Sequence, residues 1–495
     1  MSLSICSECL SRLRISTTPR RTLPIVAATW MQTTSFHTTA AQYKSPLLKK
    51  KATQQGSSAP RARQSQSARL KKKSRERPKL PPVGERRAQR RRIVLSNTNA
   101  IPVSNMETWS KENVAEEKHI GQMMALDGGL LDQLRDSRAF KTTQNWGLFR
   151  RPATLIRQET IKVAKEMQDI ESADGANKFV KRLVVGERAS GKSILMLQAM
   201  SMAYMKRWIV LNIPEAQEHV NNTSSYAPLR HAETDTEQMY TQPHLTQLLL
   251  QRAVASNESV LKTLKLNHSH AKPLSLKSNA TLYDLAQQGA ADFHVSSPAW
   301  QALYKELSVP GVNPRPPVLV AADGVDHWMG PTLYRNSEHK IIHAHQFTLV
   351  KRFTNFLFSS PGAASPFVNG GMVLFSTSGS NTPAHPTFEL LLSQMRAVQY
   401  QHMAPTDPDF PLPKPYSKPD ERVLALSGAA TAHNNVHLME LKGLGREESR
   451  GYLEYFARSG ILHQKITDGF VGEMRGLSGG GVVGELARLG RRAIA

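Results

Sequence analysis

The chain has 495 residues, enough for two to four domains, and its 40% hydrophobic content is enough for a substantial buried core. The formal net charge of +24 is concentrated near the N-terminus, because residues 44–92 hold 18 Lys or Arg against two Glu. No apolar run approaches the roughly 20 residues of a membrane-spanning helix, so the sequence predicts no transmembrane segment.

Residues 1–43 predict a mitochondrial presequence. They are rich in Arg, Ser and Thr, contain Glu8 as their only acid, and can form a short amphipathic basic helix. A secretory signal is the alternative, but the longest apolar run, LPIVAATWM, lies too late and is flanked wrongly. We therefore expect import into the mitochondrial matrix, with loss of Cys6 and Cys9, the only two cysteines.

Residues 44–104 predict a disordered basic arm. Clusters of three lysines or arginines stand at 49–51, 71–73 and 90–92, separated by Gln, Ser, Pro and Ala. Such a segment buries too little apolar area to offset the entropy of ordering it. Its charge favours ribosomal RNA as the partner, since basic arms bind phosphate backbones. A solubilising tail and a lipid surface are the alternatives.

A globular core is predicted for residues 105–403, where apolar segments of strand and helix type alternate. Strands are predicted at 179–185, 208–213, 318–323 and 370–380. Helices are predicted at 150–170, 194–206, 246–264 and 341–358. This alternation indicates an α/β fold with a parallel sheet covered by helices on both faces.

The C-terminal part begins with a proline-rich loop. Residues 404–433 contain six prolines between 404 and 420, which predicts an extended surface loop. Residues 434–495 then predict an edge strand, VHLMELKGL, a helix, REESRGYLEYFARSG, and a glycine-rich turn into a short last helix.

The segment GERASGKS matches the full pattern of a phosphate-binding loop, between an apolar strand and a helix. Its members are Gly186, Glu187, Arg188, Ala189, Ser190, Gly191, Lys192 and Ser193. Glycines allow main-chain N–H groups to converge on phosphate oxygens, and the following helix adds its N-terminal dipole. Lys192 is expected to reach the β- and γ-phosphates and the Ser193 hydroxyl to coordinate Mg²⁺.

A second metal-binding side chain is expected at the end of a neighbouring strand. Asp323, which closes VLVAAD, fits this position and would hold Mg²⁺ through water. The next residue is Gly324 rather than Glu, so the carboxylate that orients an attacking water in many ATPases is missing there. Asp326 would serve only if the turn points it inward. We therefore predict slow or absent hydrolysis and assign no catalytic residue.

Other polar residues indicate a function less specifically than the loop and Asp323 do. Ser376 and Thr377 end the strand MVLFST, where Thr377 either faces the γ-phosphate or caps a turn. Arg446 and Arg488 are expected to be solvated rather than to bind phosphate. Three histidines lie close together in the sequence and could form a metal cluster on one predicted helix: His339, His343 and His345. No Glu accompanies them, so packing or surface roles are favoured.

Taken in order, five segments resemble the death-associated protein family of mitochondrial small-subunit ribosomal proteins, in a fungal form. They are RLVVGERASGKS, WIVLNIPEA, YTQPHLTQLLL, VLVAADGVDHW and HLMELKGLGREESRGYLEYF. The resemblance is colinear over about residues 145–490. Ala189 and Ser190 stand where the family usually has Gly or Thr, but both are small enough for the loop to close.

The resemblance implies a P-loop NTPase domain of the AAA+/STAND type with a helical C-terminal part. It implies a place in the small mitochondrial ribosomal subunit, with contacts to rRNA, other mitoribosomal proteins and the large subunit. It also implies a structural guanine nucleotide, GTP or GDP, held by Gly186, Gly191, Lys192, Ser193 and Asp323. The residues themselves leave ATP open, since no guanine-specific NKxD signature is present. An active motor, or a ribosome assembly factor, is the alternative.

Overall fold

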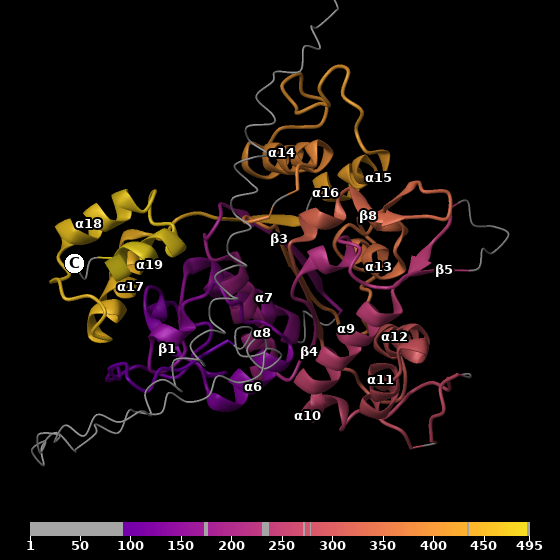
Figure 1. The fold of residues 1–495 in the computed structure, drawn as a ribbon, viewed down its shortest axis with the longest axis horizontal. Coiled ribbons are helices and arrows are strands. Elements are labelled where there is room, and N and C mark those ends of the chain that lie inside the picture. Colours follow the sequence, from indigo (N-terminus) through magenta and orange to yellow (C-terminus); the bar gives the residue numbers. More distant parts are fainter. Residues whose placement is uncertain are drawn as a thin grey trace, which may run out of the picture. The chain divides into compact units, whose positions relative to one another are not determined.

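The computed structural model describes residues 93–172, 177–229, 237–270, 273–277, 279–381, 383–432 and 435–492 (Figure 1). It divides the chain into two units, residues 1–81 and 82–495, and every described residue belongs to the second. The predicted presequence and the predicted basic arm up to residue 92 therefore lie outside the described residues.

A parallel sheet of five strands forms the centre of the described unit, in the order β11-β3-β10-β7-β4. Its strands are β3 (Phe179–Gly186), β4 (Ile209–Ile213), β7 (Val318–Asp323), β10 (Gly371–Ser376) and β11 (His437–Leu441). All four strands predicted in the core are confirmed. The predicted edge strand is also confirmed, because among the described residues β11 pairs only with β3.

Alternate side chains of each strand enter two different cores, one on each face of the sheet. In β10, Val373 and Phe375 belong to one apolar cluster, whereas Met372 and Leu374 belong to the other. Both faces are buried, so the strands read as continuous apolar runs rather than as alternating patterns. The α/β class predicted from the sequence is therefore correct.

Helices cover both faces of the sheet. One face packs against α6 (Gly128–Asp136), α7 (Gln158–Glu171) and α8 (Lys192–Met205), which contribute Leu130, Ile161 and Leu195 to its core. The other face packs against four helices: α9 (Pro243–Ser256), α11 (Leu282–Ala291), α12 (Phe293–Ser308) and α13 (Thr348–Leu357). Figure 1 shows α9, α11 and α12 side by side on this second face.

The remaining elements are shorter or peripheral. The short strands are β1 (Met123–Ala125), β2 (Ala153–Leu155), β5 (Ala227–Pro228), β6 (Tyr240–Thr241), β8 (Pro331–Arg335) and β9 (Ile341–His343). The further α-helices are α10 (Glu258–Leu261), α14 (Pro386–Tyr400), α15 (Glu421–Leu424), α16 (Ser427–Thr431), α17 (Arg446–Arg458), α18 (Asp468–Leu477) and α19 (Val483–Arg492). Short 3₁₀ segments span Glu117–His119, Trp146–Leu148, Ala216–His219, Val325–Trp328 and Ala344–Gln346. Within the described ranges, no helix is both long and apolar enough to cross a bilayer.

Three predicted helices are shorter than expected. The one at 150–170 begins only at Gln158, since Ala153–Leu155 pairs with β1 as a strand. The one at 246–264 breaks at Asn257, whose side chain accepts from Val210 N at 2.8 Å and donates to Val210 O at 2.9 Å. This side chain satisfies the main chain of the edge strand β4, which explains the break.

The prediction of a helix at 341–358 is wrong for its first part. The prediction that three histidines share one helix is therefore wrong as well. Ile341–His343 is strand β9, which pairs with β8, and α13 begins only at Thr348. The side chain of His343 accepts a hydrogen bond from His345 N at 3.1 Å and so caps the intervening 3₁₀ turn. His339 lies in the β8–β9 turn. In the described part of the chain, no three His, Cys, Asp or Glu side chains form a metal-binding group.

Candidate functional site

The 186–193 loop has the strand–loop–helix geometry that its sequence predicts. β3 ends at Gly186, and α8 begins at Lys192. Gly191 adopts φ +101°, a left-handed conformation that side chains disfavour, and so sets the turn into the helix. Ser190 N donates to Glu187 O at 3.3 Å, which closes the loop upon itself. The main-chain amides at the start of α8 therefore lie at the position where helix N-termini bind phosphate.

Lys192 is held inside this loop. Its Nζ donates to the carbonyl oxygens of Gly186 and Glu187 at 2.7 and 2.8 Å. Burial lowers the pKa of the ammonium, while Asp323 and Asp326 oppose this effect. The lysine is thus a largely buried cation whose charge is stabilised by two nearby carboxylates.

Asp323 gathers side chains from three other parts of the chain. Its Oδ2 accepts a hydrogen bond of 2.6 Å from Ser193 Oγ, and its Oδ1 accepts one from Ser376 Oγ. Lys141 Nζ also binds Oδ2 and forms an ion pair there. The structure therefore brings together Ser193 and Asp323, the two residues predicted to hold Mg²⁺, and adds a lysine that sequence reasoning missed.

Ser376 and Thr377 differ in their surroundings, although both are buried at the end of β10. Ser376 is the residue that contacts Asp323, whereas Thr377 is anchored through its main-chain N–H to Val184 O at 3.0 Å. Parallel strands end at one edge of the sheet, which is why polar residues from β7 and β10 meet here. The sequence left two roles open for Thr377, a contact with the γ-phosphate or a turn cap, and the phosphate contact stays a prediction.

Asp326 points inward. Gly324 adopts φ +84° and leads into the 3₁₀ turn that buries this carboxylate. Asp326 Oδ1 accepts a hydrogen bond of 2.7 Å from Ser378 N, and its buried Oδ2 has no hydrogen-bond partner. Burial, together with the charge of Asp323, raises the pKa of Asp326 to about 6. Asp326 was expected to replace the missing carboxylate only if the turn points it inward, and the turn does so.

A cavity of about 1140 Å³ opens beside Asp323, beyond the carboxyl ends of β4, β7 and β10. Its wall includes Arg135, Arg138, Lys141, Asp323, Gly324 and Ser378. Open α/β sheets bind ligands at this edge. The size is of the order of a nucleotide pocket, since ligand pockets commonly measure about 300–1000 Å³.

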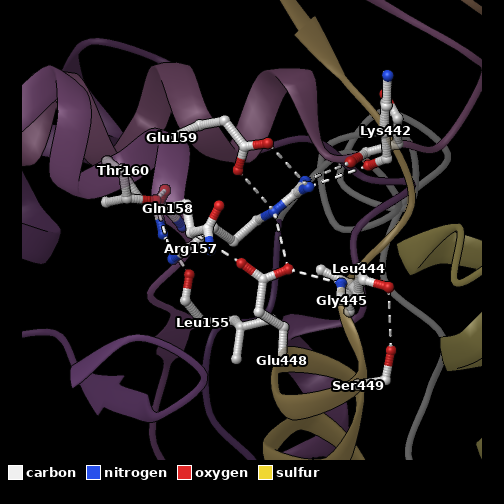
Figure 2. A network of polar contacts seen from close by, with 12 residues as sticks. Leu155, Arg157, Gln158, Glu159, Thr160, Lys442, Leu444, Gly445, Glu448 and Ser449 are labelled. Atoms are coloured by element: carbon white, nitrogen blue, oxygen red, sulfur yellow. Dashed lines mark hydrogen bonds and ion pairs between the residues drawn. The ribbon is translucent and has the colours of Figure 1, made fainter. Parts of the chain in front are cut away.

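Arg157 joins the loop to the C-terminal part (Figure 2). Its Nη1 donates to Ser190 O at 3.1 Å and its Nη2 to Lys442 O at 3.0 Å. Two acids, Glu159 and Glu448, flank the same guanidinium, with Nε 3.3 Å from Glu159 Oε2 and 3.9 Å from Glu448 Oε2. A single buried cation thus ties the loop to the segment that precedes α17.

The last three helices form one group, and the first turn of α19 contacts the loop. α17, α18 and α19 share an apolar core that includes Leu453, Val471 and Leu486, and Figure 1 shows them as one group. The first turn of α19 reaches the loop, where Gly484 N donates to Ala189 O at 3.0 Å. Arg488 is half exposed and pairs with Glu485 at 2.8 Å, in agreement with the solvated role expected for it.

Comparisons with known proteins identify relatives of the chain. The family model described as mitochondrial ribosomal death-associated protein 3 matches residues 154–489. A Neurospora crassa protein called small ribosomal subunit protein mS29 is 37% identical over 99% of this chain and 98% of its own length. A protein of the same name from Schizosaccharomyces pombe is 24% identical over 70% of this chain and 67% of its own length. Another from Mus musculus is 24% identical over 37% of this chain and 46% of its own length.

Proposed function

Because the chain belongs to the mitochondrial ribosomal death-associated protein 3 family, we propose that it is a structural component of the small subunit of the mitochondrial ribosome. The observation that carries the proposal is the full-length relative whose name places it in the small ribosomal subunit. Contacts with the rRNA and with neighbouring ribosomal proteins follow from such a place. The 18 basic residues between 44 and 92 supply the charge for the rRNA contact. Contact with the large subunit is a further part of the proposal.

The second part of the proposal is that the 186–193 loop binds a nucleotide, GTP or GDP, with ATP as the alternative. Three observations support it: the strand–loop–helix geometry, the buried Lys192, and the cavity beside Asp323. A nucleotide that binds only the folded chain stabilises it by mass action. We infer that the ligand acts as part of the folded structure.

The residues present suit Mg²⁺ by chemical type. The Ser193 hydroxyl and the Asp323 carboxylate are hard oxygen donors, which this ion prefers, and they lie 2.6 Å apart. They would hold the ion, with Asp323 acting through water. When bound, Mg²⁺ neutralises phosphate charge. Lys141 Nζ binds the same Asp323 Oδ2, however, so these two residues would hold the ion only if the lysine moved away.

Hydrolysis is proposed to be slow or absent. Gly324 occupies the position next to Asp323, and a glycine has no carboxylate to orient a water. One observation favours the alternative, an active motor or assembly factor: Asp326 is buried close to Asp323 and Lys192. Its raised pKa leaves it mostly ionised at neutral pH, so it has the charge of a general base.

Two measurements on purified mitochondrial ribosomes test the proposal. In a high-salt sucrose gradient, we expect the chain to remain with the small subunit. An assembly factor or a motor would dissociate instead. Mass spectrometry of nucleotides extracted from these subunits is expected to detect GDP or GTP in stoichiometric amount. An empty site would contradict the structural-ligand function, and turnover near 1 s⁻¹, typical of working enzymes, would favour the motor.

A further inference from the structure

Lys141 lies in the candidate site although no motif marks it. It belongs to the loop between α6 and the 3₁₀ turn at Trp146, 182 positions before Asp323. The ion pair between the two residues is well shielded, because the side chain of Lys141 is 30% exposed and that of Asp323 only 9%. A shielded pair of this kind is screened by salt far less than a surface pair.

The oxygen that Lys141 contacts is the one that a metal ion would need. Asp323 Oδ2 already accepts the hydroxyl of Ser193, and Lys141 Nζ binds the same atom. Mg²⁺ requires near-octahedral oxygen ligands at about 2.0–2.1 Å and retains several waters. An ammonium on Oδ2 occupies the space of those waters and repels a second cation.

The lysine also faces the space in which a polyphosphate would lie. Lys141 lines the cavity together with Arg135 and Arg138. Asp323, which Lys141 Nζ contacts, also attracts the ammonium of Lys192, so both cations lie around one carboxylate. Two ammonium groups near each other are unfavourable alone, and an anion between them relieves the repulsion.

We propose that Lys141 takes the place of the divalent cation at Asp323, so that the site holds a nucleoside di- or triphosphate with little dependence on Mg²⁺. This inference rests on the proposed nucleotide function. The ammonium is a compact point charge that can face phosphate and carboxylate oxygens at once. It offers no coordination positions that would bridge two phosphate oxygens and align them for transfer. A site of this kind retains its ligand rather than turning it over.

Binding of the metal alone gives the first test. The full-length chain and its variants are titrated with Mn²⁺ in the absence of nucleotide, and free Mn²⁺ is followed by electron paramagnetic resonance. Lys141→Gln is expected to bind Mn²⁺ at least tenfold more tightly than the wild type. Lys141→Arg keeps the charge and should resemble the wild type. Lys340→Gln is the matched control, since Lys340 is exposed and pairs with Glu338 away from the site.

Equal Mn²⁺ affinity in the wild type and Lys141→Gln overturns the proposal. Thermal unfolding of each variant checks that it folds. If Lys141→Gln does not fold, Lys141→Met replaces the ammonium with a chain of similar length and takes its place in the same titration.

Calorimetric titration with GDP, in Mg²⁺ and then in EDTA, gives the second test. We expect the wild-type Kd to change less than about threefold when Mg²⁺ is removed, and that of Lys141→Gln to rise tenfold or more. A wild type that depends on Mg²⁺ as strongly as the variant contradicts the proposal. If neither GDP nor GTP binds any variant while the Mn²⁺ gain persists, the nucleotide function fails, but Lys141 still excludes the divalent cation.

Discussion

The main-chain N–H of Gly484 donates a hydrogen bond of 3.0 Å to the carbonyl oxygen of Ala189. One residue lies in the last helix and the other in the middle of the phosphate-loop motif. Ala189 itself adopts φ +62°, which is uncommon for a residue with a side chain. The C-terminal helix therefore stabilises an unfavourable loop conformation, and the state of the loop is linked to the docking of α17, α18 and α19.

Replacing Gly484 tests this link. A Cβ at Gly484 would lie 2.5 Å from the Cβ of Ala189, so Gly484→Ala must displace α19 or the loop. We expect a loss of about 1–3 kcal/mol in the free energy of unfolding, as for other overpacked sites. Gly472→Ala, in α18, is the control, because a Cβ there meets nothing within 4 Å. Urea denaturation that ranks the two variants equally would disprove the link.

Arg157 should contribute strongly to the stability of the fold. Arg157→Met removes both hydrogen bonds to Ser190 O and Lys442 O and leaves two acids beside an uncharged side chain. Breaking a buried pair in this way costs about 3–5 kcal/mol. Chemical denaturation gives the value.

The matched control for Arg157 is Arg450→Met. Arg450 is half exposed and pairs with Glu454 and Asp468, and surface pairs contribute only about 0–1 kcal/mol. Similar losses in the two variants would mean that the Arg157 network does not stabilise the fold more than a surface pair does.

Asp326 should make the free energy of unfolding depend on pH. Its pKa in the folded chain is about 6, raised chiefly by burial from the usual aspartate value of 3.8. The folded state therefore binds more protons than the unfolded state between these values. The stabilisation is complete below about pH 4 and is lost as the pH rises through 6. At about 1.36 kcal/mol per unit, the effect is of the order of 3 kcal/mol.

The comparison of wild type with Asp326→Asn isolates the contribution of Asp326 ionisation to the free energy of unfolding. Asn keeps an acceptor for Ser378 N but cannot ionise. The variant should gain stability relative to the wild type as the pH rises from 4 to 7, measured by urea denaturation at each pH. A constant difference between the two proteins over this range would exclude Asp326 as the cause.

Lys192 should be required for nucleotide affinity but not for folding. Lys192→Met removes a charged donor to phosphate, worth about 1.5–3 kcal/mol, or roughly 10- to 150-fold in Kd. Fluorescence titration with a labelled GDP analogue measures the loss, and Lys340→Met, on the exposed β8–β9 turn, is the control. An unchanged Kd for Lys192→Met would place the nucleotide elsewhere.

Much of the fold was predictable because its signals are local. The strands β3, β4, β7 and β10 are continuous apolar runs, and burial of both sheet faces produces such runs directly. The 186–193 motif combines glycine and serine at fixed spacing between a strand and a helix, and the structure reproduces that geometry. The errors occurred where a neighbouring strand overrode helical periodicity, as β1 did at Ala153–Leu155 and β8 at Ile341–His343.

The amino-acid pattern alone was sufficient for the strand–loop–helix at GERASGKS, because turn conformation and burial depend on residues a few positions apart. Folding decided which distant groups surround it. Lys141 reaches Asp323 over 182 positions, and Gly484 reaches Ala189 from the last helix. Such contacts depend on how helices and loops pack over the finished sheet edge, and no local spacing encodes that packing. The loop was therefore visible in the sequence, whereas the internal cation and the C-terminal support beside it became visible only in the folded chain.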